Sequence, residues 1–178
     1  MKNYKIIHLV RKVSPTSMPW NDLFRMHRLL DRSSSGYVFS FNNDKKSGAY
    51  LDQNTNNKYF VLNLVDSFWI LCKIALKNKR SKRVLIFHVH NMSLIPYIII
   101  IKLFGGKSVL NVHNSLANFN FIQYSFFRLG WLFFDAIISV SDSVGEEIVN
   151  KFPRAERKVY PIRNGINIQQ LRQINNLD

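Results

Sequence analysis

Short apolar runs alternate with stretches of helical periodicity along most of the chain. The clearest apolar runs occupy residues 4–10 (YKIIHLV), 84–89 (VLIFHV) and 136–140 (AIISV), and their brevity and high Ile and Val content are typical of buried strands. Residues 19–30 instead carry apolar side chains at the spacing of an amphipathic helix that starts at Pro19. This alternation predicts an α/β, Rossmann-like fold, in which a parallel sheet carries crossover helices on both faces.

The rest of the chain extends this alternation. Further strands are predicted at 37–41, 58–65, 109–112 and 159–162, and further helices at 67–77, 93–104, 118–134 and 143–152. We expect a Ser-x-x-Glu capping box, Ser143 to Glu146, to open the last helix. Gly105 and Gly106 are expected to end the helix before them, because glycine readily adopts a positive φ. Residues 42–57 are rich in Asn and are interpreted as a flexible connection.

Size and composition agree with one globular domain. The 178 residues are 47% apolar and only 20% charged, which allows a real hydrophobic core and excludes a disordered chain. We expect the domain to cover residues 1–168, with an interdomain linker or C-terminal tail over 169–178. The one cysteine, Cys72, excludes an internal disulfide, and its apolar helical surroundings favour a buried, inert thiol.

The chain is strongly basic. Its 25 Lys and Arg residues against 11 Asp and Glu residues give a formal net charge of +14. Such a charge attracts nucleic acid, anionic lipid headgroups and phosphorylated substrates alike. No recognised nucleic-acid-binding motif is present and the aromatic residues occupy core-like positions, so we expect no nucleic-acid partner. An anionic membrane surface stays among the expected partners.

Two apolar stretches invite comparison with membrane spans. Residues 94–101 are far shorter than the ~20 residues that a span requires. Residues 121–140 are interrupted by Gln123, Arg128 and Asp135. The N-terminus also lacks the apolar core of a secretory signal. We therefore expect a cytoplasmic protein, with peripheral attachment to the inner face of the cell membrane as a further option.

Polar residues follow the predicted strands. These segments are rich in His, Asn and Ser, and they are residues 11–19, 88–91, 113–118, 141–143 and 163–167. In open α/β sheets, ligands bind in the crevice outside the carboxyl ends of the strands. We therefore expect the functional site to be built from these segments.

The same segments carry a family resemblance. The runs VLIFHVHN, KLFGGKSVLNVHNS, FFDAIISVSDSVGEEI and KVYPIRNGIN follow one another in an order and spacing that resemble the N-terminal, acceptor-side domain of GT-B glycosyltransferases. The similarity is to the large retaining family that builds capsular polysaccharide, exopolysaccharide and lipid-linked glycans. It is strong over residues 84–167 and weak over 4–30. It implies sugar transfer from a nucleotide-sugar to a polysaccharide or lipid-linked acceptor, with retention and without a cofactor or an essential metal.

The histidines are the first candidates for this chemistry. His113 matches the family histidine that faces the reaction centre, where imidazole can donate to or accept from a sugar hydroxyl. The alternative is a histidine satisfied by the sheet backbone. His88 and His90 lie two residues apart and so point to one face of their strand, and we expect packing for His88 and cleft lining for His90. No set of carboxylates or thiols completes a metal site with them, so we predict no metal.

Amides, hydroxyls and one guanidinium complete the predicted substrate-binding set. Amides and hydroxyls both donate and accept hydrogen bonds, which suits sugar hydroxyls. The predicted set is His90, Asn91, Asn114, Ser115, Ser14, Thr16 and Arg11. For Asn91, Asn114 and Ser115 the alternative is a turn or a helix cap, and for Ser141 we favour the cap.

The sequence departs from the family in two places. Residues 13–19 contain no glycine where many relatives place a Gly-Gly pair near the donor phosphate. The family's pair of donor-binding Glu residues, eight positions apart, is also missing, because the chain contains only Glu146, Glu147 and Glu156. We therefore expect the nucleotide-sugar to bind a missing domain or a second protein subunit, and the isolated chain to be inactive. The alternative is a non-catalytic partner that recruits or regulates a separate glycosyltransferase.

Overall fold

A computed structural model describes residues 4–11, 37–41, 48–51, 58–79 and 84–163. These residues form an eight-stranded sheet in the order β3-β4-β2-β1-β5-β6-β7-β8. The strands are β1 (Tyr4–Val10), β2 (Tyr37–Phe41), β3 (Gly48–Leu51), β4 (Lys58–Leu62), β5 (Val84–Val89), β6 (Lys107–Val112), β7 (Ala136–Ser139) and β8 (Val159–Pro161). Only β3 is antiparallel to its neighbour, β4. The predicted α/β, Rossmann-like fold is therefore confirmed.

The sheet changes direction at its first strand. From β1 the chain moves to β2 on one side, and it later returns from β4 to place β5 on the other side of β1. The sheet then continues outward through β6, β7 and β8. The junction of β1 and β5 is thus a topological switch point, where ligands of such folds bind at the carboxyl ends of the strands.

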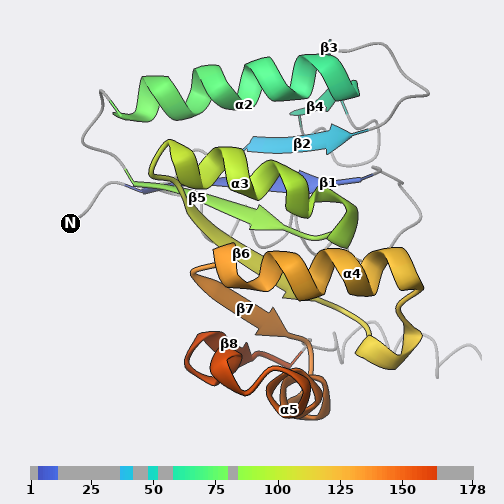
Figure 1. Cartoon of the computed structure of the whole chain (residues 1–178). Coiled ribbons are helices and arrows are strands. Elements are labelled where there is room, and N and C mark those ends of the chain that lie inside the picture. The colour runs from blue at the N-terminus through green and yellow to red at the C-terminus, as the bar shows by residue number, and fades with distance from the viewer. Residues whose placement is uncertain (1–3, 12–36, 42–47, 52–57, 80–83, 164–178) are drawn as a thin grey trace, which may run out of the picture.

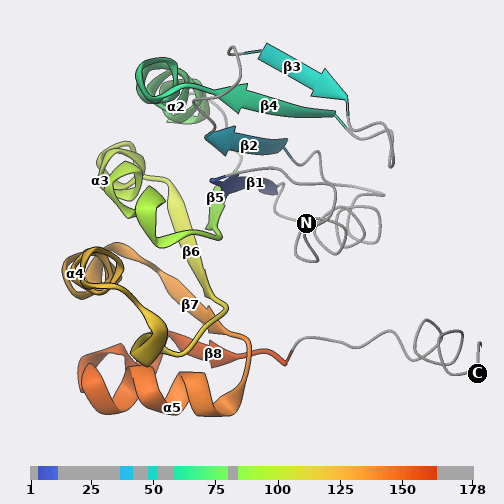
Figure 2. The ribbon, with the colours of Figure 1, turned by 90° about the vertical axis from the view of Figure 1, so that its right-hand side faces the viewer.

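The described helices follow the strands in chain order. They are α2 (Leu64–Lys79), η1 (Met92–Leu94), α3 (Ile95–Leu103), η2 (Leu116–Asn118), α4 (Phe121–Gly130), η3 (Trp131–Phe133), α5 (Asp142–Lys151) and η4 (Pro153–Lys158), where η marks a 3-10 helix. Figures 1 and 2 show α2, α3 and α4 side by side over one face of the sheet, with α5 beside β8. The helix predicted over 19–30 lies outside the described residues.

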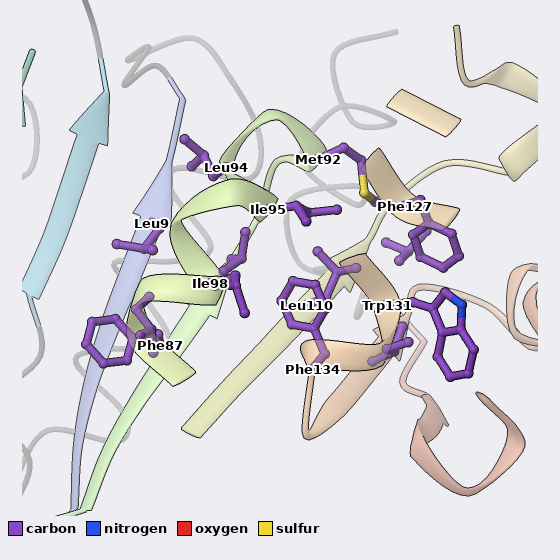
Figure 3. Packing of buried hydrophobic residues seen from close by; sticks show 14 of the residues in the cluster. Leu9, Phe87, Met92, Leu94, Ile95, Ile98, Leu110, Phe127, Trp131 and Phe134 are labelled. Carbon is purple, nitrogen blue, oxygen red and sulfur yellow. The ribbon is translucent and has the colours of Figure 1, made fainter. Parts of the chain in front are cut away.

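The core lies between this helical layer and the sheet (Figure 3). On β5, residues 85, 87 and 89 are buried while the residues between them are only half-buried, so one face of the strand lies against the helices. Phe87 and Leu110 of the sheet pack with Ile98 of α3 and Phe127 of α4, all of them fully buried. Gly105 ends the turn after α3 with φ of 76°, as predicted.

Two local predictions are wrong. Residues 48–51, taken as part of a flexible connection, form the edge strand β3, which pairs Ala49 with Phe60. The capping box predicted from Ser143 to Glu146 does not form, because Ser143 lies inside α5; the helix is capped by Ser141, as favoured for that residue, whose hydroxyl accepts from the Val144 amide. Both features depend on a partner or a backbone angle that a local pattern does not specify.

The structure also shows whether any described helix could span a membrane. Within the described ranges, no helix combines the length and the apolar character that crossing a lipid bilayer would require.

Candidate functional site

The ends of β1 and β5 are joined by hydrogen bonds at the switch point. The Arg11 amide donates to Asn91 Oδ1 at 2.8 Å, and the His90 amide donates to the Leu9 carbonyl at 3.0 Å. The predicted residues Arg11 and Asn91 are therefore neighbours although 80 positions separate them in the chain. The Asn91 side chain holds the end of β1 in place, so part of its role is structural.

Four histidines gather on one face of the sheet. His8 Nδ1 and His90 Nε2 lie 3.0 Å apart. The ring centroids of His88 and His90 are 4.3 Å apart, and those of His90 and His113 are 6.0 Å apart. The predicted shared face of His88 and His90 is confirmed, because the alternation along β5 turns Phe87 and Val89 to the opposite, helix-covered face.

His8 is the member of this cluster that the sequence analysis did not single out. The parallel pairing of β1 with β5 aligns His8 with His88, so the same pleat brings both rings to one face. His8 is 4% exposed, and its ring lies 5.0 Å from that of His88. The signal was a polar residue inside the apolar run YKIIHLV, and its partner became visible only with the strand order.

With His88 and His90, His8 makes a group of three imidazoles, and this bears on the prediction that no metal binds. His8, His88 and His90 each offer a nitrogen, and these three atoms lie within 4.8 Å of one another. Three histidines with an open fourth position are a ligand set that zinc accepts. The prediction of no metal relied on the lack of carboxylates and thiols, and that reason no longer suffices. The 3.0 Å approach of His8 and His90 is also explained by a hydrogen bond between the two rings, whose direction depends on their tautomers.

His113 follows β6 at the carboxyl edge and is half-buried. Burial lowers the pKa of its imidazole below the ordinary value of 6.5, so the ring is neutral at pH 7. Its Nε2 atom is buried and has no hydrogen-bond partner among the described residues. A neutral imidazole can donate from one nitrogen and accept at the other, which is the capacity that a sugar hydroxyl requires.

The loop after His113 is fixed by a carboxylate. Ser115 Oγ donates to Glu147 Oε2 at 2.7 Å and accepts from the Ala117 amide at 3.1 Å. Glu147 also accepts from the amides of Leu116 and Ala117. Burial alone would raise the pKa of Glu147, but the hydrogen bonds from Ser115, Lys151 and the Leu116 amide outweigh it and lower that pKa.

The hydroxyl of Ser115 therefore has the capping role that was the alternative to substrate binding, and Glu147 is a structural residue that sequence reasoning missed. Asn114, directly before it, is exposed at the edge of the sheet.

A cavity of about 430 Å³ opens beside Arg11 and Asn91. Its wall combines polar and apolar side chains from β2, from the segment after β5 and from the start of α4. The lining residues that can hydrogen-bond are Arg11, Asn91, Ser93, Tyr97, Asn120 and Gln123, and the aromatic ones include Phe41 and Phe126. Ser93 Oγ is buried and has no hydrogen-bond partner in the described part of the chain.

The predicted site residues therefore divide into two groups. Arg11 and Asn91 line the cavity, whereas His113, Asn114 and Ser115 belong to the neighbouring end of β6 and do not line it. His90 lies between the groups, because it contacts both His8 and His113. Ser14 and Thr16 lie outside the described residues.

Solved structures with the same fold include three sugar-related proteins. HepE from Anabaena, in complex with UDP, matches with a TM-score of 0.67 and 15% identity over 97% of this chain and 50% of its own. The lipopolysaccharide outer core galactosyltransferase WaaB gives a TM-score of 0.61 and 14% identity, over 91% of this chain and 46% of its own. A trehalose-6-phosphate protein from E. coli, bound with UDP-2-fluoro glucose, gives a TM-score of 0.60 and 10% identity, over 93% of this chain and 50% of its own.

The chain spans about half the length of these GT-B structures. Among curated proteins, no sequence matches it closely enough to count as a relative. The sequence model of Glycosyltransferase Family 4, however, matches residues 38–170. Because that match covers well over half of its 178 residues, the chain belongs to Glycosyltransferase Family 4.

Proposed function

We propose that this chain is the acceptor-binding half of a glycosyltransferase that moves a sugar from a nucleotide-sugar to a polysaccharide or lipid-linked acceptor. The observation that carries the proposal is the cavity at the switch point, where Arg11 and Asn91 meet beside a mixed polar and aromatic wall. Hydrogen-bonding side chains with aromatic neighbours suit a glycan, and a guanidinium suits a phosphate on its carrier. The position is the one at which open α/β sheets bind ligands.

His113 is the residue that we assign to the reaction centre. It stands at the end of β6, and His90 links it to the β1–β5 junction. Its pKa, lowered by burial, keeps the ring neutral, so it can bridge a sugar hydroxyl without charge repulsion or desolvation of an ion. Asn114 and Asn91 then position the acceptor beside it.

We propose that the donor half of the site lies on a separate domain. The solved neighbours HepE and the E. coli protein hold UDP or a UDP-sugar, and this chain covers about half of each. We propose that a donor-binding domain closes over the carboxyl edge and brings a nucleotide-sugar to His113, with transfer by retention in the cytoplasm. The isolated chain is then inactive, because holding two substrates together supplies much of the rate of a transferase.

The test uses membranes from a host strain that lacks this chain, supplied with radiolabelled nucleotide-sugars and the purified full chain. We expect the wild-type chain to restore labelled glycan. His113→Ala should lower the initial rate by about tenfold or more, because one hydrogen bond to substrate is worth about 1.5 kcal/mol. Arg154→Ala serves as the matched control, since Arg154 is exposed on η4 and remote from the carboxyl edge.

Two outcomes would contradict the proposal. Restoration by wild type and His113→Ala at equal rates would indicate a non-catalytic partner that recruits or regulates a separate transferase. No restoration by the wild-type chain with any nucleotide-sugar would contradict both roles.

A further inference from the structure

We propose that the outer face of the α2–α3–α4 layer rests on an anionic membrane surface. Of the twelve exposed large apolar residues in the described part of the chain, nine lie on these helices or on η3, which directly follows α4. Only Val84, Tyr160 and Ile162 lie elsewhere. Single exposed apolar residues are ordinary, but their concentration on one layer marks an interaction surface.

The exposed residues share one face of each helix. On α2, Trp69, Lys73 and Leu76 are exposed and lie three or four positions apart, which places them on one stripe. On α4, Ile122 and Leu129 lie seven positions apart and are 63% and 70% exposed. The helices lie side by side in front of the sheet in Figure 1, so the exposed residues belong to one helical layer.

The charge of this layer identifies the partner. Its three helices contain five basic residues and one acidic residue, namely Lys73, Lys77, Lys79, Lys102 and Arg128 against Asp66. Lys102 is engaged by Asp135, whereas Lys73 and Arg128 are exposed beside the apolar stripes. Apolar side chains with Lys and Arg around them are the composition that binds anionic lipid headgroups. The same charge disfavours a second copy of the chain, because two such faces would repel.

The helical layer also borders the candidate site. Ile122 belongs to the exposed face and at the same time lines the cavity beside Arg11 and Asn91. A membrane against α4 would therefore bring the mouth of the cavity close to the lipid surface. A lipid-linked acceptor could keep its chain in the bilayer while its head reaches the cavity. This last step rests on the proposed function, whereas contact with the membrane does not.

The test is co-sedimentation of the full chain with vesicles of phosphatidylcholine, alone or mixed with phosphatidylglycerol. We expect binding to the mixed vesicles that weakens as salt is added. Leu129→Glu should reduce the partition coefficient at least tenfold, and Arg128→Gln about fivefold on anionic vesicles only. Ile162→Glu and Arg154→Gln are the matched controls, since both side chains are exposed away from this layer, and they should bind like wild type.

Three results would overturn the proposal. The first is equal binding to neutral and anionic vesicles, and the second is a loss with Ile162→Glu as large as that with Leu129→Glu. The third is no vesicle binding together with a dimer in light scattering that Leu129→Glu dissociates, because a second copy would then cover this face. Because the vesicles carry no acceptor, failure here leaves the transfer assay above unaffected, and failure of that assay leaves the binding result intact.

Discussion

The two edges of the sheet use their polar residues differently. At the amino edge, the Asp135 carboxylate accepts from Lys102 Nζ at 2.6 Å, Lys107 Nζ at 3.1 Å and the Ser108 amide at 2.8 Å. At the carboxyl edge, His113 Nε2 has no hydrogen-bond partner among the described residues, and Arg11 lines a cavity. Asp135 holds the first edge together, whereas His113 and Arg11 at the second edge lie where a ligand can bind.

The amino edge is the place where substitution should cost most stability. Burial alone would raise the pKa of Asp135, but the hydrogen bonds from Lys102, the Ser108 amide and Lys107 outweigh it and lower that pKa from 3.8 to about 2. That difference corresponds to about 2 kcal/mol of stabilisation at neutral pH. We expect Asp135→Asn to lose about this much free energy of unfolding, measured by urea denaturation. If His113→Asn lost as much free energy of unfolding, the two edges would not differ in their contribution to stability.

The Asp135 carboxylate also makes the stability of the protein depend on pH. Because its pKa is lowered on folding, the stabilisation is fully present above about pH 4 and is lost as the pH falls towards about 2. The difference in unfolding free energy between wild type and Asp135→Asn should therefore be constant from pH 5 to 7 and shrink below about pH 4. Denaturation at a series of pH values measures it. A difference that grows on acidification would contradict the assigned hydrogen bonds.

At the carboxyl edge, Asn91 should contribute less to the free energy of unfolding than Asp135 does. Asn91→Ala removes the acceptor for the Arg11 amide, an exposed hydrogen bond, and should cost about 1 kcal/mol or less. Asn91→Asp keeps an acceptor oxygen at that position and is the matched control. If the alanine variant lost as much stability as Asp135→Asn, Asn91 would have to be counted with the structural residues.

His113 should show the smallest effect on stability and a shifted titration. Burial lowers its pKa, so protonation opposes folding and the wild type loses stability as the pH falls through about 6.5. His113→Gln should lack this loss. The titration midpoint of His113 in proton NMR should lie below the ordinary 6.5, and a midpoint above that value would indicate a nearby carboxylate instead.

The sequence was informative about most of the strands and much less informative about how strands pair. Runs such as VLIFHV specify a buried strand by themselves, because alternation and β-branched content are local properties. The edge strand β3 is only four residues long and gains its order from pairing with β4, so no local signal revealed it. Ser141 caps α5 as favoured for that residue, whereas the capping box predicted at Ser143 does not form, because the start of a helix depends on backbone angles as well as on residue type.

The candidate site shows the same limit. The strand ends rich in His and Asn do lie at one edge of the sheet, since parallel strands bring their carboxyl ends together. The contact of His8 with His90 and that of Arg11 with Asn91 both cross from β1 to β5, and these strands are neighbours only through the topology. Adjacent residues also proved to have different surroundings, because Asn91 lines the cavity while His90 joins the histidine cluster.

The most direct test of acceptor binding at the carboxyl edge is the kinetics of Arg11→Ala in the restored transfer reaction. Initial rates would be measured with acceptor and nucleotide-sugar varied in turn. If Arg11 and its cavity hold the acceptor, the KM for acceptor should rise about tenfold or more while the KM for the nucleotide-sugar stays unchanged. A rise confined to the nucleotide-sugar would place the donor, and not the acceptor, on this half of the enzyme.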